Sequence, residues 1–256
     1  DLSSAISKVG VHKFLDTLRC VSGCDSIIQL SLTVRPQKRE GGYYVKKKGT
    51  GDGSDWENAM SPEDFSRYLP LAYDGDTFHI AEGVYKSSFV DSTMGRVYRV
   101  NSSVSLIGGY PDTVSSISTP PTPELFVTKL SADVKNNDYT YYYPHSLDYT
   151  PYSNFEENDS LLLYVTGEKK LTLFGLTLSG VKSCDRGVID LSDGASLEMN
   201  QTVVQGNAAS AIRGENVDVI VNNSLFTHNY SKRGAVFRLK GSKLNVYSSS
   251  AYENMA

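Results

Sequence analysis

The chain has 256 residues, of which 39% are hydrophobic and 21% charged, and its formal net charge is −4. This composition supports a packed core and excludes a globally disordered chain. The acidic balance argues against a nucleic-acid partner, which would require a basic surface. No stretch reaches the roughly 18 apolar residues that a membrane-spanning helix needs. The aromatic set is dominated by 17 tyrosines, whose rings suit half-exposed sheets and binding faces because the hydroxyl can stay in water.

Residues 1–38 are expected to form the C-terminal end of an upstream β module plus a linker. Apolar and polar residues alternate over 28–34, which predicts a half-buried strand after a turn at Ser22-Gly23. A segment of this length cannot bury a core by itself. Residues 19–34 resemble the closing strands of small β-sandwich modules that recur in large surface proteins of Bacteroidetes-type bacteria.

The three cysteines give no metal-binding pattern. Cys20 and Cys24 flank the short turn, where they can form a disulfide or remain two reduced thiols. Their spacing is not that of a CxxC pair and no second pair follows, so a zinc site is not expected. Cys184 is expected to be unpaired and buried.

One helix is predicted, over about residues 61–72. Ser61 suits the N-cap and Pro62 the first helical position, while Phe65, Tyr68 and Leu69 give the helix one apolar face. Nothing else in the chain has a helical pattern. A solenoid must cover the open apolar end of its first coil, so we expect this helix to be an N-terminal cap rather than an ordinary surface helix.

The C-terminal third contains a repeat. Equivalent strands begin at Leu171, Leu197, Val219 and Leu244, at separations of 26, 22 and 25 residues. Periods of 20–50 residues are typical of solenoids, and units without a helix exclude leucine-rich, ankyrin and tetratricopeptide repeats. The prediction is an all-β fold, a right-handed parallel β-helix over residues 39–256. Its inward-facing residues should include Leu171, Leu173, Leu197, Met199, Val219, Val221, Leu244 and Val246.

Each of three coils also has an asparagine ten residues after the start of its strand: Asn207, Asn229 and Asn254. Stacked side-chain amides can bond to one another and to the neighbouring backbone. A structural ladder is therefore a better explanation for these residues than catalysis.

Short sequence features resemble known β-helix proteins. Gly234-Ala235-Val236 with Phe226-Thr227-His228-Asn229 resembles the repeats of bacterial polymorphic outer-membrane proteins and of β-helix adhesins. Residues 43–59, 75–85 and 106–110 resemble, in order, the opening of Bacteroidetes β-helix proteins of the pectate-lyase-like superfamily. The resemblance covers roughly 43–256 and implies the fold. It leaves the function open, because this fold hosts lyases, hydrolases and non-catalytic adhesins alike.

The best candidate site lies in a long loop predicted over 111–159. Loops of this length are usually functional, and this one is crowded with tyrosines on which sugar rings can stack. The alternative is that the rings, with Phe155, anchor the loop to the solenoid. The predicted ligand-binding residues are Tyr141, Tyr142, Tyr143, Tyr149, Tyr152, Asp138 and His145.

Two further patterns have a simpler explanation than a ligand site. Asp133, Asn136, Asn137 and Asp138 offer oxygen ligands of the kind Ca²⁺ prefers, but the EF-hand spacing is absent. An Asx-rich turn is the preferred explanation and a Ca²⁺ site the alternative, so no cofactor is predicted. Asp190 and Arg213 should occupy equivalent sites on adjacent coils, with Lys232, Arg233 and Arg238 nearby. Such a mixture can bind a uronate, but a solvated face of alternating charges is the preferred interpretation.

The leading hypothesis is a non-catalytic, adhesin-like β-helix on the outer cell surface or secreted, which binds glycan or host extracellular matrix. The first alternative is a polysaccharide lyase or glycoside hydrolase, and the second a structural stalk. The chain begins at Asp1 without a methionine and stops inside a repeat at Ala256. Both ends are therefore expected to be cuts in a longer polypeptide, with the β-helix truncated at its C-terminus.

Overall fold

The computed structural model describes residues 8–19, 26–140 and 152–256. The chain divides into two compact units, Asp1–Gln37 and Lys38–Ala256. The first unit is a hairpin in which β1 (Gly10–Leu18) pairs antiparallel with β2 (Ser26–Val34). The second unit is a parallel β-helix whose regular secondary structure, in the described residues, is almost entirely strand, with one short α-helix.

The hairpin confirms the predicted strand but not its predicted burial. Residues 28–34 are extended, yet the exposed fractions of Ile28, Leu30 and Leu32 are 50%, 48% and 40%. These side chains lie in water because no second layer covers them among the described residues of this unit. The proposed turn and both of its cysteines, Cys20 and Cys24, lie outside the described residues.

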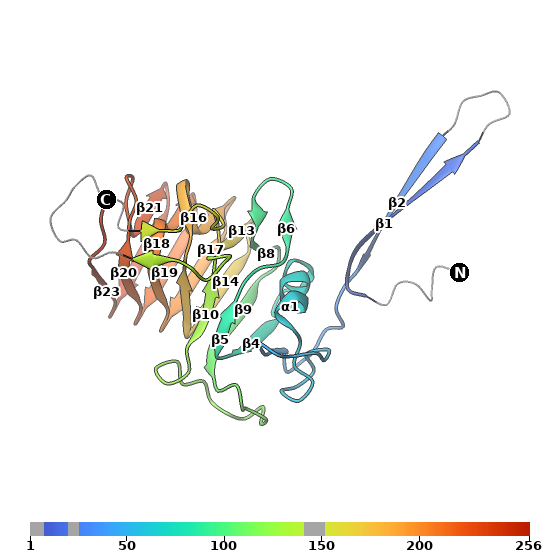
Figure 1. Ribbon diagram of the computed structural model, residues 1–256, viewed down its shortest axis with the longest axis horizontal. Helices are drawn as coiled ribbons and strands as arrows, with labels where there is room; N and C mark the ends of the chain where they lie inside the picture. Colours follow the sequence, from blue (N-terminus) through green and yellow to red (C-terminus); the bar gives the residue numbers. More distant parts are fainter. Residues whose placement is uncertain (1–7, 20–25, 141–151) are drawn as a thin grey trace. The chain divides into compact units, whose positions relative to one another are not determined.

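The β-helix is built from two parallel sheets whose strands stack coil upon coil (Figure 1). The seven-stranded sheet contains β3 (Tyr43–Val45), β4 (Thr77–Ala81), β9 (Val104–Tyr110), β14 (Lys170–Phe174), β17 (Ser196–Asn200), β19 (Asp218–Asn222) and β22 (Lys243–Tyr247). The ten-stranded sheet has two flanks that share the long strand β18 (Val203–Glu215). One flank adds β5 (Gly83–Tyr85), β10 (Thr128–Ser131), β15 (Leu176–Ser179), β20 (Leu225–Asn229) and β23 (Ser250–Tyr252). The other adds β8 (Tyr98–Val100), β13 (Leu163–Thr166), β16 (Lys182–Ser192) and β21 (Phe237–Lys240).

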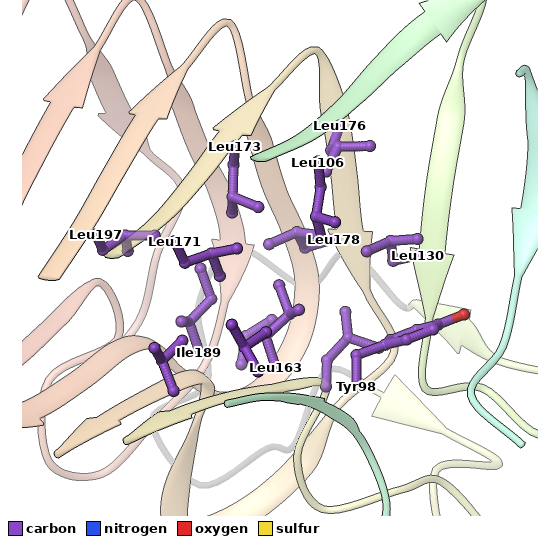
Figure 2. Close-up of a cluster of buried hydrophobic side chains, with 14 of the residues drawn as sticks. Tyr98, Leu106, Leu130, Leu163, Leu171, Leu173, Leu176, Leu178, Ile189 and Leu197 are labelled. Carbon is purple, nitrogen blue, oxygen red and sulfur yellow. The ribbon is translucent and has the colours of Figure 1, made fainter. Parts of the chain in front are cut away.

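The register of the seven-stranded sheet confirms the predicted repeat. Leu171 pairs with Leu197, Leu197 with Val219, and Val219 with Leu244. Two residues further along each strand, a second column pairs in the same way: Leu173, Met199, Val221 and Val246. Figure 2 shows Leu171, Leu173 and Leu197 of these columns in the interior. Beside them lie side chains from the two flanks of the ten-stranded sheet, such as Leu163 and Leu178. The eight residues predicted to face inward thus stack as expected.

Burial within these columns ends at the last strand. Val221 in β19 is fully buried, whereas Leu244 and Val246 in β22 are 38% and 44% exposed. The described residues place no strand on the outer side of β22, so these two side chains are covered from one side only. Position in the stack, rather than residue type, determines their exposure.

The predicted cap is also present. The side chain of Ser61 accepts a hydrogen bond from the backbone N–H of Asp64 at 3.0 Å, and α1 (Pro62–Tyr68) continues as the 3₁₀ turn η1 (Leu69–Leu71). Phe65 is fully buried, and its ring centroid lies 5.3 Å from that of Phe78 and 5.2 Å from that of Tyr98. The helix therefore covers the interior at the N-terminal end of the stack, as Figure 1 shows.

The segment from 111 to 159 is not one continuous loop. It contains β10, which pairs with β5 on one side and β15 on the other and so belongs to the solenoid. Two short elements follow, β11 (Tyr139–Thr140) and β12 (Tyr152–Ser153), which pair antiparallel. A separate hairpin, β6 (Val90–Asp91) with β7 (Gly95–Arg96), leaves the solenoid earlier in the chain. The prediction of one long loop was wrong because β10 has only four residues, too few to show a strand pattern in the sequence.

Candidate functional site

A groove of about 310 Å³ lies on the solenoid at the residue that follows β15 and at the equivalent positions within β18 and β20. Its lining comes from four successive coils, those of β10, β15, β18 and β20, and from the segment between β10 and β13. The lining residues are Lys129, Asp138, Phe155, Ser179, Gly180, Gln205, Gly206 and His228.

The floor of the groove is a column of left-handed turn residues. Leu178, Val204 and Phe226 are paired across the coils, so Gly180, Gly206 and His228, two residues further on, are equivalent positions. Their φ values are +82°, +63° and +52°. The floor is therefore bare backbone on two coils and carries an imidazole on the third.

The two glycines differ in the space above them. A Cβ on Gly180 would lie 2.8 Å from the backbone nitrogen of Asp133, so this position requires glycine. A Cβ on Gly206 would meet no atom within 4 Å. The open part of the groove thus lies over Gly206.

The predicted asparagine ladder holds this floor in place. Asn207 donates from Nδ2 to Oδ1 of Asn229 at 2.8 Å, and Asn229 donates from Nδ2 to Oδ1 of Asn254 at 2.9 Å. Each amide also bonds the backbone of the preceding coil, as Asn229 does through the carbonyl of Val204 at 2.8 Å. Because Asn207 and Asn229 are almost fully buried, these bonds are shielded from water and make the turns rigid.

One wall of the groove is formed by Asp138. Asn158 donates from Nδ2 to both carboxylate oxygens of Asp138, at 3.0 and 2.8 Å, and to the carbonyl of Gly180 at 2.6 Å. Burial of Asp138 raises its pKa to about 6, against the lowering effect of the Asn158 hydrogen bond, and the nearby charge of Asp133 raises it further. Asp138 is therefore a carboxyl group that exchanges its proton near neutral pH.

Asp133 has a structural role instead. Its carboxylate accepts backbone N–H groups from Asn136 at 2.7 Å and from Asn137 and Asp138 at 3.4 Å. This is the predicted Asx-rich turn. In the described ranges, no three His, Cys, Asp or Glu side chains are grouped so that they can hold a metal ion.

The opposite end of the groove carries His228, which is held between two coils. Its Nδ1 lies 2.7 Å from Oγ1 of Thr227 on the same strand, and its Nε2 lies 2.9 Å from Oε2 of Glu253 on the next coil. The imidazole is 44% exposed, so it is oriented by these contacts yet reachable from solvent.

The structure brings one predicted site residue, Asp138, into the groove. Tyr141, Tyr142, Tyr143, Tyr149 and His145 lie outside the described residues. Tyr152 is in β12, and its side chain is outside the described part of the chain. Phe155, at 4% exposure, lies against the solenoid and so acts as an anchor of its segment.

Several groove residues were missed from the sequence. Lys129 was missed because β10 was not recognised as a strand. Gly180 and Gly206 had a usable signal, since they are 26 residues apart and stand directly before the ladder position. In the sequence, His228 stands out only as part of the repeat segment Phe226-Thr227-His228-Asn229, not as a site residue.

Two predictions outside the groove need correction. Cys184 is exposed, because β16 departs from the regular register between Lys182 and Gly187 and turns this segment outward. Asp190 and Arg213 are paired across adjacent coils as predicted, but Asp190 is buried, so the expected solvated pair is wrong at this position.

Comparisons with known protein families, with curated proteins and with solved structures found no match. No helix in the described residues is long and apolar enough to cross a membrane. The class of protein is thus defined by its own architecture: a parallel β-helix with a polar groove across four of its coils.

Proposed function

We propose that this chain is a non-catalytic, adhesin-like β-helix that binds glycan, free or as part of a host extracellular matrix. The observation that carries the proposal is the groove. Its floor is rigid backbone, and a cation (Lys129), a carboxyl group (Asp138) and an imidazole (His228) are placed along it. Fixed polar groups of this kind select among sugar hydroxyls, and the open space over Gly206 gives room for a ring.

The proposal includes a location on the outer cell surface or in the secreted fraction. The support is the resemblance of residues 43–256 to Bacteroidetes β-helix proteins of the pectate-lyase-like superfamily and to polymorphic outer-membrane repeats. A long stack of coils with a polar exterior suits such a setting because it presents a large, stiff surface.

The enzyme alternative has one specific observation in its favour. A carboxyl group with a pKa of about 6 can donate a proton at near-neutral pH, as the general acid of a glycoside hydrolase does. Such an enzyme also needs a second carboxylate in the groove, and among the described lining residues Asp138 is the only acid. Two other acids act on Asp138: Asp133 is occupied by three backbone N–H groups, and Glu157 is paired with Lys135. The binding function therefore fits the groove better.

A single substitution can close the groove without disturbing the fold. Asparagine tolerates a positive φ, so Gly206→Asn should be accepted and should place its side chain in the open space. Gly167→Asn is the matched control, because Gly167 has a φ of +74°, equally open surroundings and a place in the turn between β13 and β14.

The experiment compares both variants with the unmodified chain on a glycan array. Gly206→Asn should lose binding at least about tenfold, an effect of about 1.4 kcal/mol, while Gly167→Asn should bind normally. Binding that survives Gly206→Asn would remove the groove as the site. Release of new reducing ends or unsaturated sugars during the incubation would replace the proposal by the enzyme alternative. The predicted role of Tyr141, Tyr142 and Tyr143 stays a prediction, which alanine substitution tests on the same array.

A further inference from the structure

A cluster of cations lies where the two flanks of the ten-stranded sheet meet. It consists of Arg186, Arg213, Lys232, Arg233 and Arg238, which we call the basic corner. These residues come from three coils: β16, the second half of β18, and β21 with the turn before it.

The strand register places like charges side by side. Asp190, Arg213 and Arg238 are successive members of one column on adjacent strands. Neighbouring strands are about 4.8 Å apart, so the two arginines stand next to each other rather than alternating with acids. The interpretation as a face of alternating charges therefore does not describe this column.

The irregular segment of β16 adds to the cluster. The Asp185 carboxylate accepts from Nη1 of Arg233 at 3.1 Å, and its backbone carbonyl accepts from Nη1 of Arg238 at 3.2 Å. These bonds reach across the intervening coil of β18 and join β16 to β21 and to the turn before β21. Arg186 follows directly, and its charge acts on Asp190.

The two acids orient the cluster without neutralising it. Asp190 is buried and accepts from the backbone N–H of Gly187 at 2.6 Å and from Nη1 of Arg213 at 3.1 Å, which fixes the Arg213 side chain. Five cations against two carboxylates leave three positive charges in excess, on a chain whose net charge is −4. Within the described ranges, Arg186 and Lys232 form no ion pair.

We infer that the basic corner binds an acidic polysaccharide through the carboxylate or sulfate groups repeated along its chain. The inference rests on the proposed glycan-binding function and names the class of glycan. A guanidinium presents a planar fork that matches carboxylate and sulfate in a bidentate way, and anchored arginines lose little side-chain entropy on binding. Cations repeated on successive coils match anionic groups repeated along a polymer.

The probes are chondroitin sulfate, which carries both anionic groups, hyaluronan, which carries carboxylates alone, and dextran, which is neutral. The test variant is Arg186→Glu with Lys232→Glu, because neither residue is ion-paired with a described carboxylate. Lys47→Glu with Lys48→Glu gives the same charge change at exposed residues of another turn and is the matched control. Thermal melting of each variant checks folding.

The unmodified chain should bind chondroitin sulfate, with an affinity that falls as salt rises, and should not bind dextran at the corner. The test variant should weaken binding at least about tenfold, and the control less than about twofold. Equal affinity for hyaluronan would show that carboxylates suffice, and binding of chondroitin sulfate alone would show that sulfate is required; both support the inference. Equal weakening in both variants, or equally tight binding of duplex DNA, would overturn it.

The two experiments distinguish failure of this inference from failure of the proposed glycan-binding function. If array glycans bind through the groove and are lost in Gly206→Asn, but acidic polysaccharides do not bind, the inference fails and the proposed function stands. If no saccharide binds in either experiment, both fail.

Discussion

The hairpin and the β-helix use the same sequence pattern with different results. In β2, Ile28, Leu30 and Leu32 alternate with polar residues and are 40–50% exposed. In β19, Val219 and Val221 alternate in the same way and are 1% and 0% exposed. Alternation specifies an extended strand with two different faces, but only a second layer of chain makes one of those faces an interior.

The largest effect should come from placing a charge in the interior. Val221→Asp buries a carboxylate without a partner and should lower the free energy of unfolding of the β-helix by about 4 kcal/mol. Leu30→Asp places the same charge on the hairpin, where the side chain is in water, and should change the free energy of unfolding by less than about 0.5 kcal/mol. Urea unfolding followed by circular dichroism measures both. Similar losses in the two variants would contradict the comparison.

The second effect concerns the asparagine ladder. Asn229→Ala removes the amide that donates to Val204 and Asn254 and accepts from Asn207, and it should cost about 2 kcal/mol because the partners stay buried. Asn200→Ala removes an exposed contact with Asn223 and should cost about 0.5 kcal/mol. The same unfolding experiment checks the pair, and an equal cost would show that burial adds nothing to the ladder.

A third pair of variants compares two valines of the same column that differ only in their position in the stack. Val221→Ala and Val246→Ala remove the same two methyl groups from one column, but Val246 is 44% exposed in the last strand. The first change should cost about 2 kcal/mol and the second about 1 kcal/mol or less. If the order were reversed, position in the stack would not determine the energy of these contacts.

The smallest effect depends on pH. Asp138 has an ordinary pKa of 3.8 and a folded-state pKa of about 6, so the folded chain binds this proton more tightly than the unfolded chain. Its stabilising contribution is present below about pH 4 and is lost as the pH rises through about 6. Asp138→Asn cannot lose a proton, so its stability relative to the unmodified chain should rise by about 1 kcal/mol over that range, after allowance for solvent screening. Melting temperatures measured from pH 4 to pH 7 check the sign, and a falling difference would contradict it.

Sequence reasoning recovered the parts of this fold that repeat. The four strand starts, the ladder and the capping signals at Ser61 and Pro62 each depend on local spacing, and the structure confirms them. The four-residue strand β10 was hidden because so short a segment has no period of its own. Its pairing with β15 depends on contacts between residues almost 50 positions apart.

The candidate site was less predictable for a related reason. Asp138 was selected from the composition of its loop, but the groove also needs Gly206 and His228, which are brought together only by stacking of coils. Exposure of Cys184 likewise follows from the irregular register of β16 between Lys182 and Gly187, which leaves no mark in the hydrophobic pattern. The buried Asp190 is held by Gly187 on its own strand and by Arg213 on the next coil, a contact that only stacking creates.

Amide hydrogen exchange of the native chain tests the central claim most directly, because it reports the protection of each strand separately. The backbone amides of β14, β17 and β19, which have paired strands on both sides, should exchange slowly and as a group. Those of β1 and β2, which form a two-stranded sheet, should exchange much faster under the same conditions. Equal, strong protection of the hairpin and the β-helix would contradict the account that stacked coils alone create the stable interior of this protein.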